Sequence, residues 1–150
     1  MKKMIMIFAG LIISIIAIYF LYNACRIQKR SSFGTDIHMI EDRFENISNI
    51  QRCYYRATLT GRNTIGPSNY KLEAVILVDE QYAEKIQKQY DWEQVQLKVE
   101  ENFLAELQIE GTAVWEHNQI FQEDILNHKF VGKVYFSSEK RIIYLQVENL

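Results

Sequence analysis

The chain has 150 residues, a formal net charge of −2 at pH 7 and 48% hydrophobic residues. This length provides for one domain, or one domain with a membrane segment, and excludes two sizeable domains. One Pro and 6 Gly exclude a collagen-like or Pro-rich chain, and 2 Cys exclude a disulfide-framed mini-protein. No catalytic, metal or nucleotide motif stands above background, so we expect no cofactor.

The charges are unevenly distributed along the chain. Residues 1–30 contain five Lys and Arg and no acid, whereas residues 31–150 contain all 19 acids and 12 Lys and Arg, a net charge of −7. A domain of this sign repels a phosphate backbone. Nucleic acid is therefore not an expected partner.

Residues 4–22 form an uncharged, almost wholly apolar run. As a helix, such a run spans about 28 Å, close to the roughly 30 Å hydrocarbon core of a bilayer. The sequence therefore predicts a transmembrane signal anchor over 1–25, with the bilayer as a partner of residues 4–22. A cleaved signal peptide and a lipoprotein modified at Cys25 are the alternatives. The predicted membrane-spanning residues are Met4, Ile5, Ile7, Phe8, Leu11, Ile12, Ile15, Ile16, Tyr19, Leu21 and Tyr22.

The flanking charges leave the orientation of this segment nearly balanced. Lys2 and Lys3 precede the run, and Arg26, Lys29 and Arg30 follow it. The Met-Lys-Lys start before a long apolar run resembles bacterial signal anchors. This resemblance implies a single-pass protein of the cell membrane with its C-terminal domain outside the cytoplasm.

After the anchor, the sequence predicts a polar juxtamembrane linker over 26–35 and an acidic α+β domain over 36–150. Apolar residues at spacings of three and four predict an amphipathic helix over 36–50, with Thr35 or Asp36 as its cap. Residues 52–60 and 70–78 are rich in Tyr, Thr and aliphatic residues, which indicates two strands of an antiparallel hairpin.

The second half of the domain alternates helices and strands. Helical spacing predicts helices over 80–90, 93–108 and 118–127, although Val95–Val99 also alternates as a strand would. Residues 129–136 and 141–147 predict a C-terminal hairpin. The expected fold is an α+β protein in which an N-terminal transmembrane helix precedes one small domain. In that domain, an antiparallel sheet of about four strands accompanies about three helices.

Candidate chemistry is sparse. His117, Asp124 and His128 are the best candidates for a small membrane-bound hydrolase or metal-dependent enzyme, because Asp124 and His128 would share a helix face. Cys53 lies between Arg52 and Arg56, which could activate a thiol, but a buried structural cysteine is the simpler interpretation.

The acidic stretch over 79–124 has 12 acids and three Lys, a net charge of −9. Such a stretch is either an ordinary solvated surface or a docking face for a basic partner. We expect a membrane-anchored extracytoplasmic protein-binding domain without catalytic activity. An accessory subunit of a membrane complex and an immunity or inhibitor protein both fit, and homo-oligomerisation stays open. The expected partner-binding acidic face consists of Glu93, Glu100, Glu101, Glu106 and Glu110.

Overall fold

A computed structural model describes residues 14–19, 27–62 and 69–149. The chain separates into two units. The first comprises Met1–Arg30 and Leu59–Asn69, and the second comprises Ser31–Thr58 and Tyr70–Leu150. Every side-chain contact discussed below lies within the second unit.

The prediction of a membrane-spanning helix over 4–22 is wrong. Among the residues that the structure describes, no helix has both the length and the apolar character that crossing a bilayer requires. Of the predicted span, the structure describes residues 14–19, which are helical and include Ile15, Ile16 and Tyr19. The predicted positions 4–12, 21 and 22 lie outside the described residues. The predicted location, a single-pass protein of the cell membrane, rests on the same run and is therefore also wrong.

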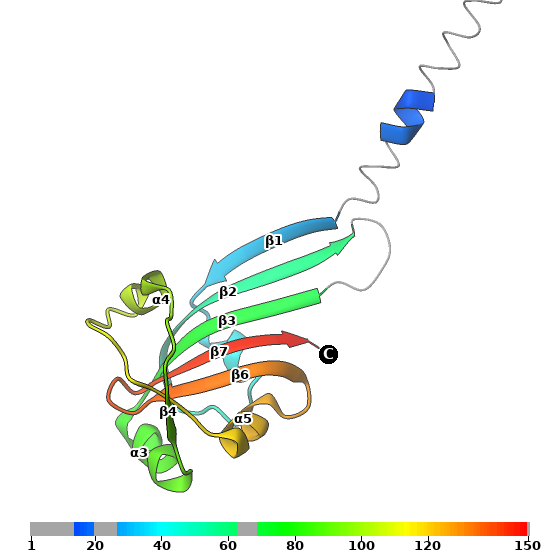
Figure 1. Cartoon of the computed structure of the whole chain (residues 1–150). Coiled ribbons are helices and arrows are strands. Elements are labelled where there is room, and N and C mark those ends of the chain that lie inside the picture. Colours follow the sequence, from blue (N-terminus) through cyan, green and yellow to red (C-terminus); the bar gives the residue numbers. More distant parts are fainter. Residues whose placement is uncertain (1–13, 20–26, 63–68, 150) are drawn as a thin grey trace, which may run out of the picture. The chain divides into compact units, whose positions relative to one another are not determined.

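The described strands form one antiparallel sheet of seven strands in the order β1-β2-β3-β7-β6-β5-β4 (Figure 1). They are β1 (Ile27–Gly34), β2 (Ile50–Arg62), β3 (Asn69–Val78), β4 (Glu93–Val95), β5 (Trp115–His117), β6 (Phe130–Ser137) and β7 (Ile142–Asn149). The predicted sheet of about four strands is therefore too small. The predicted strands at 52–60, 70–78, 129–136 and 141–147 correspond to β2, β3, β6 and β7.

The three strands beyond the four that correspond to predicted ones all lie towards the ends of the sheet. β1 occupies most of the predicted linker. The sequence does not indicate a strand there, because Ser31–Gly34 has no alternation of apolar and polar residues. β4 and β5 have three residues each, too few for a periodic pattern to show. The central strands β3, β7 and β6, by contrast, contribute apolar residues to both cores, and their sequences predict strands.

Four helices accompany the sheet: α2 (Ile37–Glu41), α3 (Glu80–Gln89), α4 (Glu101–Glu106) and α5 (Gln119–Leu126). The Asp79 carboxylate accepts a hydrogen bond from the Tyr82 amide at 2.7 Å, and so caps α3. Asp36 caps α2 and Asn118 caps α5 in the same way. These caps confirm the helices predicted at 80–90 and 118–127.

Two predicted helices are much shorter in the structure. The helix expected over 36–50 ends at Glu41, and Phe44 and Ile47 are buried from the turns that follow. The helix expected over 93–108 is divided into β4, an extended segment and α4. Its spacing misled because Val99, Phe103 and Leu107 are buried together although only Phe103 lies within α4.

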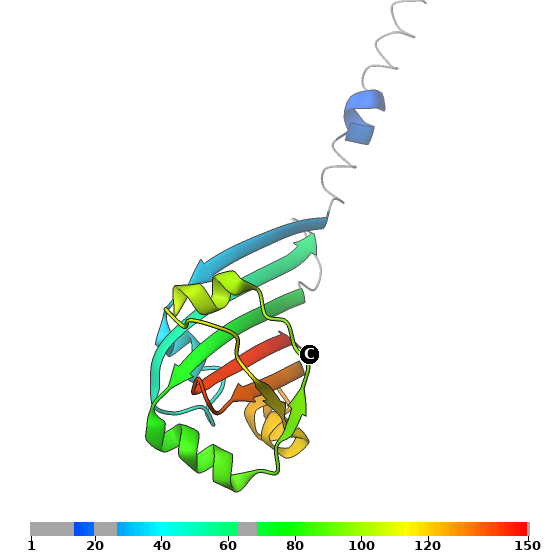
Figure 2. The same ribbon diagram turned by 60° about the vertical axis from the view of Figure 1, so that its left-hand side comes forward.

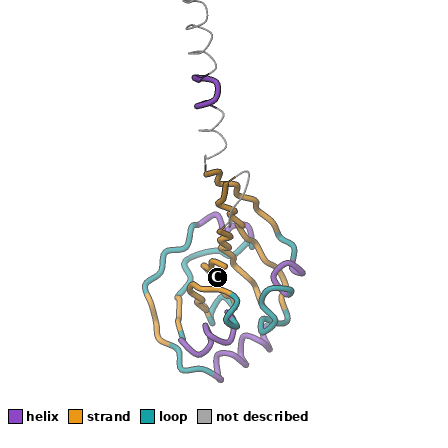
Figure 3. Tube along the Cα trace, turned by 90° about the vertical axis from the view of Figure 1, so that its right-hand side faces the viewer, coloured by secondary structure: helices purple, strands orange, loops and turns teal. Residues whose placement is uncertain are grey.

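The sheet buries a core on each face because its central strands alternate apolar side chains to both sides. On β3, Leu72, Ala74 and Ile76 belong to the first core, whereas Val75 and Leu77 belong to the second. Helices α2, α3 and α5 cover the first face, and α4 covers the second. Figure 2 shows α4 in front of the sheet, and Figure 3 shows helices and loops on opposite sides of the central strands.

Candidate functional site

All five residues of the predicted acidic face are exposed on one stretch of chain, from β4 to the loop after α4. Glu93 begins β4, Glu100 precedes α4, Glu101 and Glu106 are its first and last residues, and Glu110 follows it. These five carboxylates thus lie on one continuous stretch of chain around α4.

Glu100 differs from the other four acids because it is engaged within the molecule. Its carboxylate accepts hydrogen bonds from the Arg56 guanidinium at 3.1 and 3.3 Å. Arg56 also pairs with Glu73 on β3 and lies over the Phe103 ring, 5.4 Å from its centroid. Within the described part of the chain, Glu93, Glu101, Glu106 and Glu110 form no ion pair.

The Arg56 contacts extend into a polar network on the second face of the sheet. The Tyr144 hydroxyl donates to Glu73 at 2.6 Å and accepts from the Gln146 amide at 2.7 Å. The hydrogen bonds that the Arg56 guanidinium donates to Glu100 and to Glu73 raise the pKa of Arg56. Burial, followed by the Glu73 carboxylate, raises the pKa of Tyr144. These groups satisfy one another, so the network fixes the start of α4 on the sheet.

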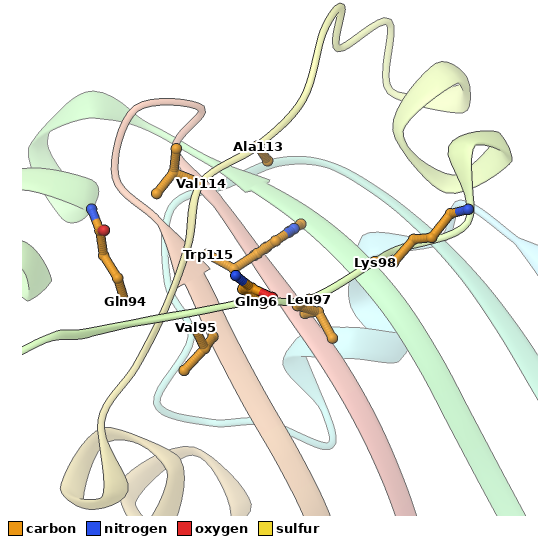
Figure 4. Close-up of a pocket in the computed structure, with 8 residues that line it drawn as sticks. All are labelled: Gln94, Val95, Gln96, Leu97, Lys98, Ala113, Val114 and Trp115. Carbon is orange, nitrogen blue, oxygen red and sulfur yellow. The ribbon is translucent and has the colours of Figure 1, made fainter.

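Beside α4, the two short strands β4 and β5 open into a fork. Their ladder pairs only Glu93 with His117, Gln94 with Glu116 and Val95 with Trp115. Figure 4 shows the two chain segments meeting near Val95 and Trp115 and separating towards Lys98 and Ala113. Chain 96–99 leads to α4, and chain 110–114 returns from it.

The fork and α4 enclose a hollow of about 490 Å3, which we call the β4–β5 groove. Its apolar lining includes Leu97, Val99, Leu104, Ile109, Ala113 and Trp115. Lys98 and Glu101 line it as well, and a second hollow on the strands shares Leu97, Lys98, Ala113 and Trp115 with it. The volume is that of a small binding site, and the lining is mainly aliphatic with one aromatic ring.

The sequence pattern does not indicate the groove residues. Helical spacing over 93–108 places Val95, Val99 and Leu107 on one face and leaves Leu97, Leu104 and Ile109 without a role. The alternation Val95-Gln96-Leu97-Lys98-Val99 was the available signal, since it predicts an extended chain with three side chains to one side.

The three residues proposed for a hydrolase or metal-dependent enzyme, His117, Asp124 and His128, do not form one cluster. His117 on β5 contacts Gln122 at 3.2 Å, and Asp124 on α5 accepts a hydrogen bond from Tyr90 at 2.8 Å. His128 lies beyond α5 in a left-handed turn. Across the described residues, no three His, Cys, Asp or Glu side chains are grouped as a metal ion would require.

Cys53 is a buried free thiol on β2, within the first core. Burial, together with the charges of Asp36 and Glu41, raises its pKa to about 11. A reactive cysteine needs a lowered pKa and access to solvent. The environment of Cys53 is that of a structural core residue.

Comparisons with protein-family models, with curated proteins and with solved structures give no match for this chain. The site is therefore interpreted from its own geometry. That geometry is of a two-faced antiparallel sheet with an acid-flanked apolar groove at its β4–β5 end.

Proposed function

We propose that this chain is a protein-binding domain without catalytic activity, and that it docks a basic segment of a protein partner in the β4–β5 groove. The observation that carries the proposal is an open apolar groove bordered by carboxylates that form no ion pair with any described residue. Glu101 lines the groove, Glu110 lies between the lining residues Ile109 and Gly111, and Glu93 precedes the forked chain.

The charge around the groove defines the chemistry of the partner. Residues 91–110 contain six acids, and Lys98 is their single cation. Opposite charge across an interface speeds encounter and excludes partners of the wrong sign. A segment that combines Lys or Arg with aliphatic or aromatic residues therefore matches both the border and the lining. Masking a basic surface, as an inhibitor or immunity protein does, is one role that this chemistry serves.

Binding energy in such a site comes mainly from the apolar residues. Trp115 lines the groove and is buried, while the neighbouring Val114 is 47% exposed. Aromatic and aliphatic anchors near the centre of an interface supply most of its affinity, and bordering charges tune specificity and association rate. We therefore expect the carboxylates to select the partner and the groove to retain it.

The test is a selection of displayed random linear peptides against the full chain. We expect enriched peptides to combine Lys or Arg with apolar residues. We expect their affinity to fall at least ~10-fold for the variant with Glu93→Lys, Glu101→Lys and Glu110→Lys, and to weaken with added salt. Glu100 is left unchanged because its reversal would break the contact with Arg56.

The matched control reverses three exposed acids on the helices of the first face: Glu41→Lys, Glu84→Lys and Glu123→Lys. It changes the net charge by the same amount, and each residue loses only a surface contact of small energy. Retained binding by this control, with loss in the groove variant, supports the proposal. Equal binding by both variants, or no enriched peptide, contradicts it.

A further inference from the structure

The backbone around the groove has unused hydrogen-bonding groups. β4 is the last strand of the sheet, with β5 as its one neighbour. Within the described chain, the backbones of residues 96–99 and 110–114 make no hydrogen bond outside the strand ladders. Extended chain with free N–H and C=O groups is a template on which another strand can pair.

The segment next to β4 is already held in the conformation that strand pairing needs. Val95 and Leu97 are half-buried and Val99 is buried, whereas Gln94, Gln96 and Lys98 are exposed. This alternation means that three side chains fix the segment to the second core. A binding strand would therefore not have to order it, which lowers the entropic cost of association.

The two sides of the fork are kept from pairing with each other. The chain between them forms α4, whose Phe103 is buried in the second core. Glu100, at the start of α4, is bound to Arg56 on β2. These contacts hold α4 against the sheet, so the β4–β5 ladder ends at Val95 and Trp115 and the backbone beyond it stays unpaired.

This edge also has few of the features that prevent strand pairing. Natural sheets protect open edges with Pro, inward-pointing charges or several Lys. Residues 93–99 contain no Pro and a single Lys, and the acids of the border repel only segments that are themselves acidic. The edge can therefore pair with a further strand, and its acidic border favours strands that carry positive charge.

We propose that the partner segment binds as an added β-strand along residues 93–99, with alternate apolar side chains in the groove and Lys or Arg side chains towards the acidic border. This inference rests on the proposed function and specifies its binding mode. Main-chain hydrogen bonds add to the affinity that the apolar contacts supply, and the groove receives alternate side chains of the added strand.

The experiment uses the full chain and a synthetic peptide in which Val alternates with Lys. Two further peptides carry N-methyl groups on every Val amide or on every Lys amide, since these two sets point to opposite edges of a strand. We expect the unmodified peptide to bind and at least one methylation pattern to weaken binding ~10-fold or more. Hydrogen exchange at the amides of residues 96–99 should slow when the unmodified peptide is bound.

The opposite results are equally clear. No binding of the Val–Lys peptide, equal binding of all three peptides, or unchanged exchange at residues 96–99 overturns the added-strand model. Acid-dependent binders recovered in the selection would then still uphold the proposed function. Slower exchange with rising protein concentration, together with a dimer in sedimentation, would instead assign the edge to a second copy of this chain and overturn the proposal.

Discussion

Individual residues on the second face act through a few well-satisfied polar contacts. Tyr144 is 1% exposed, yet its hydroxyl is both a donor to Glu73 and an acceptor from Gln146. The Glu73 side chain is 16% exposed and also pairs with Arg56. A buried polar group without a partner is costly, so each member of this network depends on the others.

Removing one hydroxyl tests this dependence. We expect Tyr144→Phe to lower the free energy of unfolding by about 1–2 kcal/mol, because Gln146 and Glu73 each lose a partner. Urea unfolding of the full chain measures the change. Tyr135→Phe is the matched control: Tyr135 stacks on Tyr144, 6.2 Å between ring centroids, and its hydroxyl makes no hydrogen bond within the described residues. Equal losses for the two variants would show that the network has no energetic role.

At the scale of elements, the β6–β7 hairpin contains a close backbone approach at Gly132. Gly132 lies on β6 opposite Val147 and has φ of +151°. A Cβ at this position would overlap the Gln146 carbonyl oxygen and lie 2.7 Å from the Val147 Cα. Only glycine therefore lets the two strands keep their spacing here.

We expect Gly132→Ala to destabilise the chain by about 3 kcal/mol or more, since the neighbours are backbone atoms that cannot rotate away. Thermal and urea unfolding measure this loss. Lys133→Ala, one residue further along β6 and exposed, should change stability by less than about 1 kcal/mol. Similar stability of the two variants would mean that the strands can separate locally without cost.

At the scale of the whole molecule, several ionisable groups are buried or half-buried in their neutral forms. Burial is the first cause that raises the pKa of Tyr82 and of Tyr90 to about 12. Burial likewise raises the pKa of Cys53 to about 11, and that of Tyr144. The folded chain therefore holds these protons more tightly than the unfolded chain does.

This difference predicts sensitivity to alkali. A raised folded pKa contributes stability that is complete below the unfolded value, about 10 for tyrosine, and is lost as the pH rises through the folded value. We expect the free energy of unfolding to fall above about pH 10, with tyrosinate absorbance appearing together with the loss of structure. A Tyr82→Phe variant should show a shallower decline. Full tyrosine ionisation in a chain that remains folded would contradict this prediction.

The sequence alone indicated the central strands, the capped helices α3 and α5, the C-terminal hairpin and the acidic stretch from Glu93 to Glu110. Each of these depends on local periodicity, a capping side chain or composition, which neighbouring residues determine. The number of strands could not be read, because β1, β4 and β5 are short or polar and exist through pairing with distant residues. The helical spacing over 93–108 likewise predicts one helix where the structure has β4, an extended segment and α4, because contacts with distant residues decide the conformation there.

The candidate groove was decided by tertiary structure. Leu97, Leu104 and Ile109 became a lining only when α4 packed on the second face and the fork opened beside it. Likewise, Glu100 differs from the other four acids because its carboxylate pairs with Arg56, which is 44 residues away in the chain. Charge and periodicity are properties of neighbours in sequence, whereas a groove and an ion pair require residues that only folding brings together.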